Sequence, residues 1–295
     1  MFAQGRALAV VIATIALASC AARLPPRPSG ATTPDPTAIE AFAAATGACR
    51  GFRSLQAELS LSGRAGSDKI RGRVIAGLET GGAVRLEGLA PFGAPIFILA
   101  GRQERGTLLL PRDHRVLRDT SIAAVLERLT GLALGADDLR LMLSGCLTDA
   151  AAPVDGRRWA SGWQAVTLGA DRVAYLRAAQ GSTVVVAADY GAWHVDYADH
   201  AGGFPRTVRV RRAEGNPKGL PPPSGLPPPS GLPPPSGLPP PSGLPPPVVD
   251  ITARIGQLET NITIDPAAFV VEIPAGTELM TLDELRSVAP LVTKP

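Results

Sequence analysis

The sequence predicts an α+β fold, an antiparallel half-open β-barrel whose open side is covered by helices. Apolar and polar residues alternate over many short segments separated by Gly-containing loops, which is typical of antiparallel strands. Helical periodicity is confined to a few places, chiefly near the middle of the chain. The hydrophobic content of 45% is ample for a core. A curved sheet with helices over its open side leaves an apolar hollow, where we expect the functional site.

The first part of the domain is predicted to be a helix followed by a meander of strands. Thr37 to Glu40 match a capping box, in which Thr37 caps a helix and Glu40 reaches back, and the helix extends to about Cys49. The hydrophobic period then changes from about 3.6 to about 2 residues. The predicted strands span residues 55–61, 70–76, 84–87, 96–100 and 107–110.

Helical periodicity returns in mid-chain and further strands follow. A helix over 122–129 is opened by Asp119, Thr120 or Ser121, and a second short helix ends near Gly145. Strands are predicted at 163–168, 172–176, 183–188, 193–197, 207–211 and 248–258 and from 263 onwards, and a second capping box at 281–284 begins a terminal helix. The folded domain is thus predicted to comprise residues 37–218 and 248–295.

Cys20 closes a segment with the features of a bacterial lipoprotein signal peptide. Arg6 gives a positive start, an apolar stretch runs from Ala7 to Leu17, and small residues precede the cysteine. The apolar stretch is shorter than the roughly 20 residues that span a bilayer. We expect residues 1–19 to be removed and Cys20 to be acylated, which gives a stable anchor once two or more chains are attached. The alternative is an ordinary signal peptide that contains a cysteine.

Two segments have compositions that do not support a packed core. Residues 20–36 are rich in Pro and small polar residues and are predicted to be a disordered tether between lipid and domain. Residues 219–247 repeat GLPPP units joined by single Ser residues, which favours polyproline II. Because the flanking segments are predicted to be neighbouring strands of a hairpin, this insertion must leave and return at nearly one point. It is a neutral repeat expansion, a ligand for polyproline-binding modules, or a spacer toward the cell wall.

The cysteine count and the net charge indicate in which compartment the protein works and which classes of partner it can bind. Cys49 and Cys146 remain once Cys20 is acylated, and an even number in an oxidising compartment favours a disulfide. Two separately buried thiols are the alternative. The net charge is only +3 and the Arg residues are scattered between apolar positions, so the chain has no nucleic-acid footprint. A weak attraction to anionic head groups stays open.

The sequence contains no motif that indicates an enzyme. It has no nucleophile elbow, P-loop, dinucleotide fingerprint or HExxH motif. His194, Asp196, Asp199 and His200 form the one polar cluster with ligand types, and an ordinary strand and turn is favoured there over a metal site. Asp113 and His114 are interpreted as a loop rather than as half of a catalytic dyad. We expect no cofactor and no metal.

The turn Pro91-Phe92-Gly93 is the most distinctive local feature of the predicted sheet. A strand enters it and an apolar strand leaves it, and Pro and Gly are turn residues, so Phe92 is predicted at an exposed hairpin tip. Burying a Phe is worth about 1.5–3 kcal/mol, so an exposed Phe92 favours contact with acyl chains or a hydrophobic partner. The alternative is that Phe92 folds back onto the core.

These features together resemble the LolB family of outer-membrane lipoprotein receptors. The resemblance is carried by the segment ending at Cys20, the 91–93 turn, and the runs Leu129-Thr130-Gly131-Leu132, Leu139-Arg140 and Leu143-Ser144-Gly145. It covers most of residues 50–150. LolB proteins have Pro-Leu-Gly at the tip, so Phe92 departs from the family pattern. The candidate disulfide, the proline-rich insertion and the long C-terminal segment depart from it as well.

The resemblance implies a binding and transfer protein without bond chemistry. Such a protein receives acylated lipoproteins from a LolA-like periplasmic carrier and passes them into outer-membrane lipid; it works as a monomer anchored on the periplasmic face. Ala21 after the cysteine agrees with outer-membrane sorting in proteobacterial lipoproteins. The acyl cavity is predicted to be lined by Leu59, Leu61, Val74, Val84, Leu86, Ile96, Ile98, Leu126, Leu129 and Leu143. Competing hypotheses are an envelope scaffold that works through its proline repeats, and a metal enzyme that uses the His194 cluster.

Overall fold

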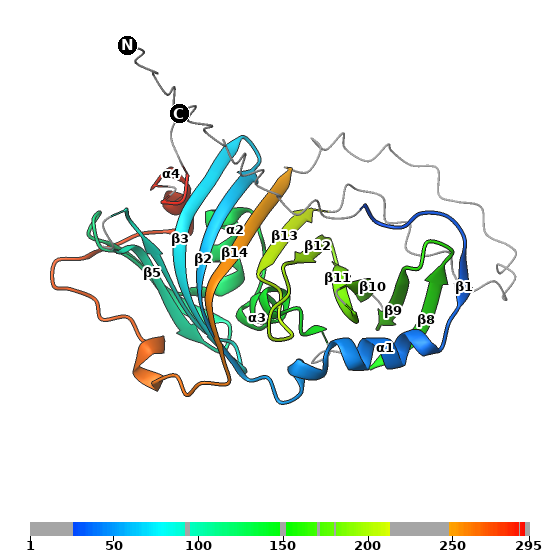
Figure 1. Ribbon diagram of the computed structural model, residues 1–295. Helices are drawn as coiled ribbons and strands as arrows, with labels where there is room; N and C mark the ends of the chain where they lie inside the picture. Colours follow the sequence, from blue (N-terminus) through cyan, green and yellow to red (C-terminus); the bar gives the residue numbers. More distant parts are fainter. Residues whose placement is uncertain are drawn as a thin grey trace, which may run out of the picture.

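A computed structural model describes residues 26–91, 95–147, 152–169, 172–179, 181–212, 248–288 and 290–292. Over these residues one open sheet of 15 strands runs in the order β1-β8-β9-β10-β11-β12-β13-β14-β2-β3-β4-β5-β6-β7-β15 (Figure 1). The strands are β1 (Thr32–Pro34), β2 (Ser54–Ala65), β3 (Asp68–Glu79), β4 (Ala83–Leu89), β5 (Pro95–Arg102), β6 (Arg105–Leu110), β7 (Arg115–Ser121), β8 (Pro153–Trp159), β9 (Gln164–Leu168), β10 (Arg172–Ala179), β11 (Ser182–Tyr190), β12 (Trp193–Ala198), β13 (Thr207–Arg212), β14 (Val249–Thr260) and β15 (Glu278–Leu279). The helices are α1 (Thr37–Ala45), α2 (Ile122–Thr130), α3 (Ala136–Ser144) and α4 (Leu282–Val288), with 3-10 turns η1 (Gly47–Cys49) and η3 (Pro266–Phe269).

Strand β14 joins two antiparallel meanders into one sheet. It pairs with β13 of the second meander on one side and with β2 of the first meander on the other. Only the short contact of β15 with β7 is parallel among the described strand pairs. The sheet is open, because β1 and β15 lie at its two ends. The predicted α+β class is therefore confirmed, with an antiparallel sheet that does not close.

Helices cover one side of the sheet at two places. Figure 1 shows α2 and α3 together on one side of the central strands, and α1 along strands β8 to β11. Helix α3 contacts β2, β3 and β4, whereas α2 contacts β6, β7 and α4. Buried side chains from both meanders and all the helices form one continuous hydrophobic core.

The N-terminal segment departs from the prediction. Residues 26–36 belong to the predicted disordered tether, yet Thr32–Pro34 pairs with β8 as strand β1. The prediction that Thr37 caps α1 is also wrong, because Asp35 accepts hydrogen bonds from the Thr37 amide (3.2 Å) and hydroxyl (2.5 Å). Asp35 also accepts hydrogen bonds from Arg158 (2.8 Å) and Gln164 (2.9 Å). These contacts attach the segment to β8 and β9, which composition alone does not reveal.

Other differences lie where polar residues interrupt the alternation. Strands β7 and β8 contain charged runs (RVLRDTS and PVDGRRW) and were not predicted. The strand predicted from residue 263 is wrong, because Asp265 caps the 3-10 turn η3 by accepting from the Ala267 amide at 2.9 Å. The capping box at 281–284 is confirmed: the Glu284 amide donates to the Thr281 hydroxyl (3.4 Å), and the Thr281 amide donates to the Glu284 carboxylate (2.7 Å).

The hairpin that carries the proline-rich insertion is confirmed. Strands β13 and β14 are antiparallel neighbours, with Arg211 opposite Asp250. The insertion at 219–247 lies outside the described residues. On its other edge β14 approaches β2 closely at Gly63, where a Cβ atom would lie 2.1 Å from the Asp250 carbonyl oxygen and φ is +151°. Only glycine fits at this crossing.

A disulfide joins the two cysteines that were predicted to pair. Cys49 follows α1 and Cys146 follows α3, and their Cα atoms are 5.4 Å apart. Both are buried. The bridge therefore connects the C-terminal end of α3 to the start of the first meander.

Candidate functional site: an apolar cavity beneath two helices

An apolar cavity of about 80 Å³ lies between the central strands and the helices α2 and α3. The sheet contributes residues from β2, β3, β4, β5, β13 and β14. Its lining consists of Leu59, Leu61, Val74, Leu86, Phe97, Leu126, Leu129, Thr130, Leu132, Leu134, Leu139, Met142, Leu143, Val208, Val210, Ile251, Ala253 and Leu291. The one polar side chain among them is satisfied, because the Thr130 hydroxyl donates to the Leu126 carbonyl at 2.8 Å. The chemistry of this lining suits an apolar ligand.

Helix α2 covers the cavity with one apolar stripe. Ile122, Val125, Leu126 and Leu129 are buried and recur at helical spacing. The helix begins at the Ser121 side chain, which accepts from the Ala124 amide, and ends where the chain turns left-handed at Gly131 (φ 77°). Ser121 is one of the three residues that were predicted from the sequence to begin this helix.

Helix α3 is fixed to the sheet at both ends. The Glu104 carboxylate, from the β5–β6 turn, accepts hydrogen bonds from the amides of Ala136 (2.8 Å) and Asp137 (3.3 Å). A negative group at a helix N-terminus satisfies free amides and opposes the positive end of the helix dipole. Asp137 in turn accepts from the Gly82 amide in the β3–β4 turn at 2.9 Å. The disulfide at Cys146 holds the other end.

Arg140 supports α3 on the side away from the cavity. Its side chain is 3% exposed, and its guanidinium lies 3.3 Å from Asp137 and 3.4 Å from the Phe52 carbonyl oxygen. The same guanidinium stacks over the Phe52 ring at 5.2 Å. A buried cation needs such partners. Arg140 is thus a structural anchor of α3.

The structure brings seven of the ten predicted cavity residues to one place and excludes three. Leu59, Leu61, Val74, Leu86, Leu126, Leu129 and Leu143 line the cavity. Val84 is fully buried, but it lies outside the lining. Ile96 and Ile98 were wrongly assigned to the lining, because both are only partly buried and lie outside it, whereas Phe97 of β5 is buried and lines the cavity.

The neighbouring strand β4 contains a residue that indicates which side chains of β5 point toward the core. Gly88 lies opposite Phe97, and a Cβ atom at Gly88 would come 2.1 Å from the Phe97 ring. Glycine in an alternating strand marks a position where a neighbour occupies the missing side chain's place. The lining residues from β13 and β14 were missed although their alternation is regular, because the sequence does not show that these strands adjoin β2.

Two predicted functional features fall largely outside the described residues. Cys20, Phe92 and Gly93 are not among them, so the acylation site and the exposure of the tip stay predictions. The base of the tip is described. Leu89, two residues before Pro91, pairs with Pro95 at the end of β4, and also with Arg73 of β3.

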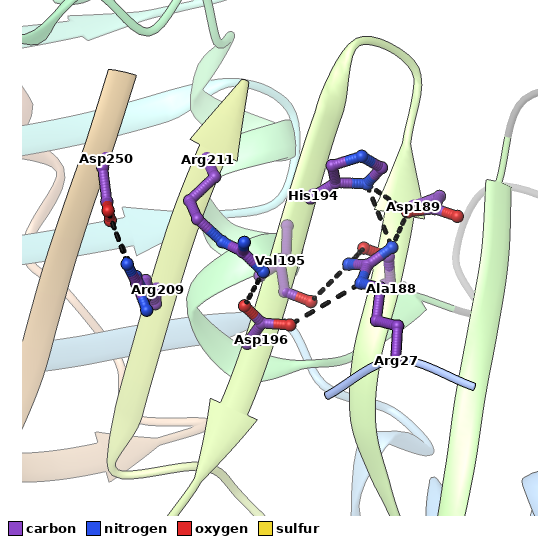
Figure 2. Close-up of polar contacts among 9 residues, drawn as sticks. All are labelled: Arg27, Ala188, Asp189, His194, Val195, Asp196, Arg209, Arg211 and Asp250. Atoms are coloured by element: carbon purple, nitrogen blue, oxygen red, sulfur yellow. Dashed lines mark hydrogen bonds and ion pairs between the residues drawn. The ribbon is translucent and has the colours of Figure 1, made fainter. Parts of the chain in front are cut away.

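The polar cluster on β12 is built from ion pairs (Figure 2). His194 Nδ1 lies 2.5 Å from the Asp189 carboxylate, and Asp196 pairs with Arg211 at 2.6 Å. Across the part of the chain that the structure describes, no three His, Cys, Asp or Glu side chains are grouped to hold a metal ion. None of the described helices has the length and apolar character needed to cross a bilayer.

Comparison with known proteins does not assign the chain to a family. No protein-family model matches it, and neither does any curated protein. It is similar to the solved structure of a DUF1329 family protein from Desulfovibrio piger, with 11% identity over 80% of this chain and 97% of that one and a TM-score of 0.42. A putative outer membrane lipoprotein-sorting protein domain from Vibrio parahaemolyticus has 8% identity, coverage of 78% and 95%, and a TM-score of 0.40. The lipoprotein LppX of Mycobacterium tuberculosis has 8% identity, coverage of 78% and 100%, and a TM-score of 0.30.

Proposed function

We propose that this protein binds the acyl chains of other lipoproteins beneath α2 and α3 and aids their insertion into the outer membrane. The observation that carries the proposal is the cavity itself, which is lined almost wholly by apolar side chains from the sheet and from both helices. Acylated Cys20 holds the protein to the periplasmic face of that membrane. A LolA-like carrier supplies the lipoproteins, and the protein acts without a cofactor.

The size of the cavity requires that the helices move. An apolar cavity of roughly 150 Å³ holds one benzene molecule, so a cavity of about 80 Å³ holds only a short piece of hydrocarbon. Helix α3 is fixed at both ends, whereas the described ion pair that fixes α2 is the exposed contact of Arg128 with Asp283 of α4 (2.9 Å). We therefore expect α2 to move outward when an acyl chain enters, away from α4, which the ion pair of Glu284 with Arg115 holds to β7 at 2.9 Å.

The driving force for transfer is the burial of methylene groups. Each buried CH₂ is worth about 0.8 kcal/mol, so small differences in the length of chain enclosed decide where the lipoprotein resides. A cavity that encloses only part of a chain in its closed state favours release into a bilayer that encloses all of it. The lipoprotein therefore moves from the cavity to the bilayer without an external source of energy.

A transfer assay tests the proposal. A carrier is loaded with labelled lipoprotein, the acylated full-length protein is added, and delivery to liposomes is measured. We expect delivery by the unaltered chain, strong loss in Phe92→Glu, and no loss when residues 219–247 are deleted. Val154→Glu is the matched control, because Val154 is an exposed apolar residue (69%) that lies on β8 rather than in the predicted tip.

The opposite pattern would favour an envelope scaffold. In that case deletion of 219–247 disables the protein in cells, and Phe92→Glu leaves its function intact. Absence of any delivery by the unaltered protein would contradict the proposed transfer.

A further inference from the structure

The face of the sheet opposite the cavity carries a polar groove of about 530 Å³. In β14, Ile251 and Ala253 face the cavity, so Asp250, Thr252 and Arg254 face the other way. We call this second surface the outer face. The groove is lined by Ser62, Gly63, Arg64, Lys69, Ala198, Asp199, Thr207, Arg209, Asp250, Thr252 and Arg254.

Strand register arranges the basic residues of this groove in rows. Arg64 lies opposite Asp250 on β14 and opposite Lys69 on β3. One step along, Ser62 lies between Thr252 and Arg71, and Thr252 in turn lies opposite Arg209. A further step along, Ser60 lies between Arg254 and Arg73. The rows cross four adjacent strands, β13, β14, β2 and β3, so cations are distributed across the outer face rather than along one edge.

Positive charge exceeds negative charge in the groove. Its lining contains four cationic side chains and the carboxylates of Asp199 and Asp250. Arg209 holds Asp250 with two hydrogen bonds, at 2.7 and 2.5 Å. Among the described residues, no carboxylate forms an ion pair with Arg64 or Arg254, and both arginines are exposed. These two guanidinium groups are therefore available to an anionic ligand.

The N-terminal segment is attached to the same outer face (Figure 2). Arg27 forms an ion pair with Asp189, donates to the Ala188 carbonyl oxygen at 2.9 Å, and lies 3.7 Å from Asp196. Burial alone would raise the pKa of Asp189, but hydrogen bonds and the charge of Arg27 lower it to about 2. The carboxylate that holds Arg27 therefore stays ionised at neutral pH.

The attachment limits the distance between the predicted lipid anchor and the groove. Arg27 follows Cys20 by seven residues, which span at most about 25 Å when extended. Asp196 of β12 lies opposite Arg209 of β13, and Thr252 of β14 and Ser62 of β2 follow, and neighbouring strands are about 5 Å apart. The groove thus lies within about 15 Å of the point where the anchoring segment is attached.

We propose that the outer-face groove binds the phosphate groups of anionic phospholipids and so orients the anchored domain on the membrane. Two independent observations carry this: Arg64 and Arg254, which form no ion pair with a described carboxylate, and the attachment of the anchoring segment to the same face. Guanidinium groups bind phosphate oxygens with paired hydrogen bonds. The base of the predicted tip hairpin is near the groove, because Arg73 lies opposite Leu89 of β4 and in the same row as Arg254.

Vesicle binding by the non-acylated mature chain tests the proposal. The chain 20–295 with Cys20→Ala is mixed with vesicles of phosphatidylcholine alone or of equal parts phosphatidylcholine and phosphatidylglycerol, and sedimentation gives the bound fraction. We expect binding only to the anionic vesicles and weakening by salt. The double variant Arg64→Gln with Arg254→Gln should bind about 30-fold more weakly, since each basic residue at an anionic surface contributes about 1 kcal/mol, about fivefold.

The matched control removes the same charge elsewhere. Arg112→Gln with Arg118→Gln alters two exposed arginines around β7, and near-ultraviolet circular dichroism checks that both double variants fold. Equal losses in the two double variants would show attraction by net charge alone and would overturn the proposal. So would equal binding to neutral and anionic vesicles. Calorimetric binding of inorganic phosphate without any vesicle preference would overturn it too, by revealing a site for a small anion. The assay contains no lipoprotein cargo, so failure of acyl transfer leaves its outcome unaffected.

Discussion

Removal of the disulfide should destabilise the protein mainly through its unfolded state. Cys49 and Cys146 are 97 residues apart in sequence. In the chain-entropy relation, a cross-link across about 100 residues contributes about 4.7 kcal/mol. Replacing both cysteines by alanine leaves the Cα positions and the surrounding apolar packing compatible with the fold, since both residues are buried among apolar side chains. We therefore expect a loss of unfolding free energy of up to about 4.7 kcal/mol.

Urea unfolding of the double variant measures this loss. Without the cross-link the unfolded chain exposes more surface, so the denaturant slope should rise while the midpoint falls. Wild-type protein unfolded with reductant is the control and should behave like the variant. A loss below about 1 kcal/mol with an unchanged slope would show that the bridge does not restrict the unfolded chain.

Four further substitutions test individual contacts. Hydrogen bonds from Gln164, Thr37 and Arg158 lower the pKa of Asp35 from 3.8 to about 2, so its contribution to stability is complete above about pH 4 and is lost as the pH falls toward 2. Unfolding of Asp35→Asn across pH 2–5 should show the stability difference from wild type narrowing toward pH 2; a constant difference would contradict this. Glu104→Ala removes the acceptor at the start of α3 and should cost about 1–2 kcal/mol in urea unfolding, whereas a value equal to that of exposed Glu127→Ala would argue against capping. Arg27→Gln should speed hydrogen exchange at residues 26–34 at least about tenfold, because a charged hydrogen bond is worth about 1.5–3 kcal/mol, and unchanged exchange would mean that Arg27 does not hold the segment. Ala253→Leu fills the cavity with the equivalent of about three methylenes, each worth about 0.8 kcal/mol, so binding of a fluorescent fatty acid should weaken about 60-fold. Gln257→Leu adds the same side chain on the surface and should not weaken binding.

The sequence predicted the elements whose signals are local. The capping box at Thr281, the alternation of Leu59 and Leu61, and the helical stripe of α2 are all readable within a few residues. The hairpin around the proline-rich insertion was also readable, because the strands on both sides alternate clearly. The seven cavity residues found in advance all come from such segments.

What the sequence did not reveal depends on contacts between distant segments. Strand β8 has charged residues along it and is stabilised by its neighbours β1 and β9 rather than by its own pattern. The run 96–100 is continuously apolar, so its facing depends on Gly88 admitting Phe97 from the next strand. The attachment of Arg27 to Asp189 joins residues 162 positions apart, which no local pattern reports.

The proposed function requires that hydrocarbon chains enter the space beneath α2 and α3. Photo-crosslinking of the acylated protein with a palmitate analogue that carries a diazirine near its methyl end tests this directly. We expect crosslinks to cavity residues of α2, α3, β2 and β14, and we expect Ala253→Leu to abolish them. Crosslinks confined to the outer face, or a pattern that Ala253→Leu leaves unchanged, would mean that hydrocarbon does not enter this space.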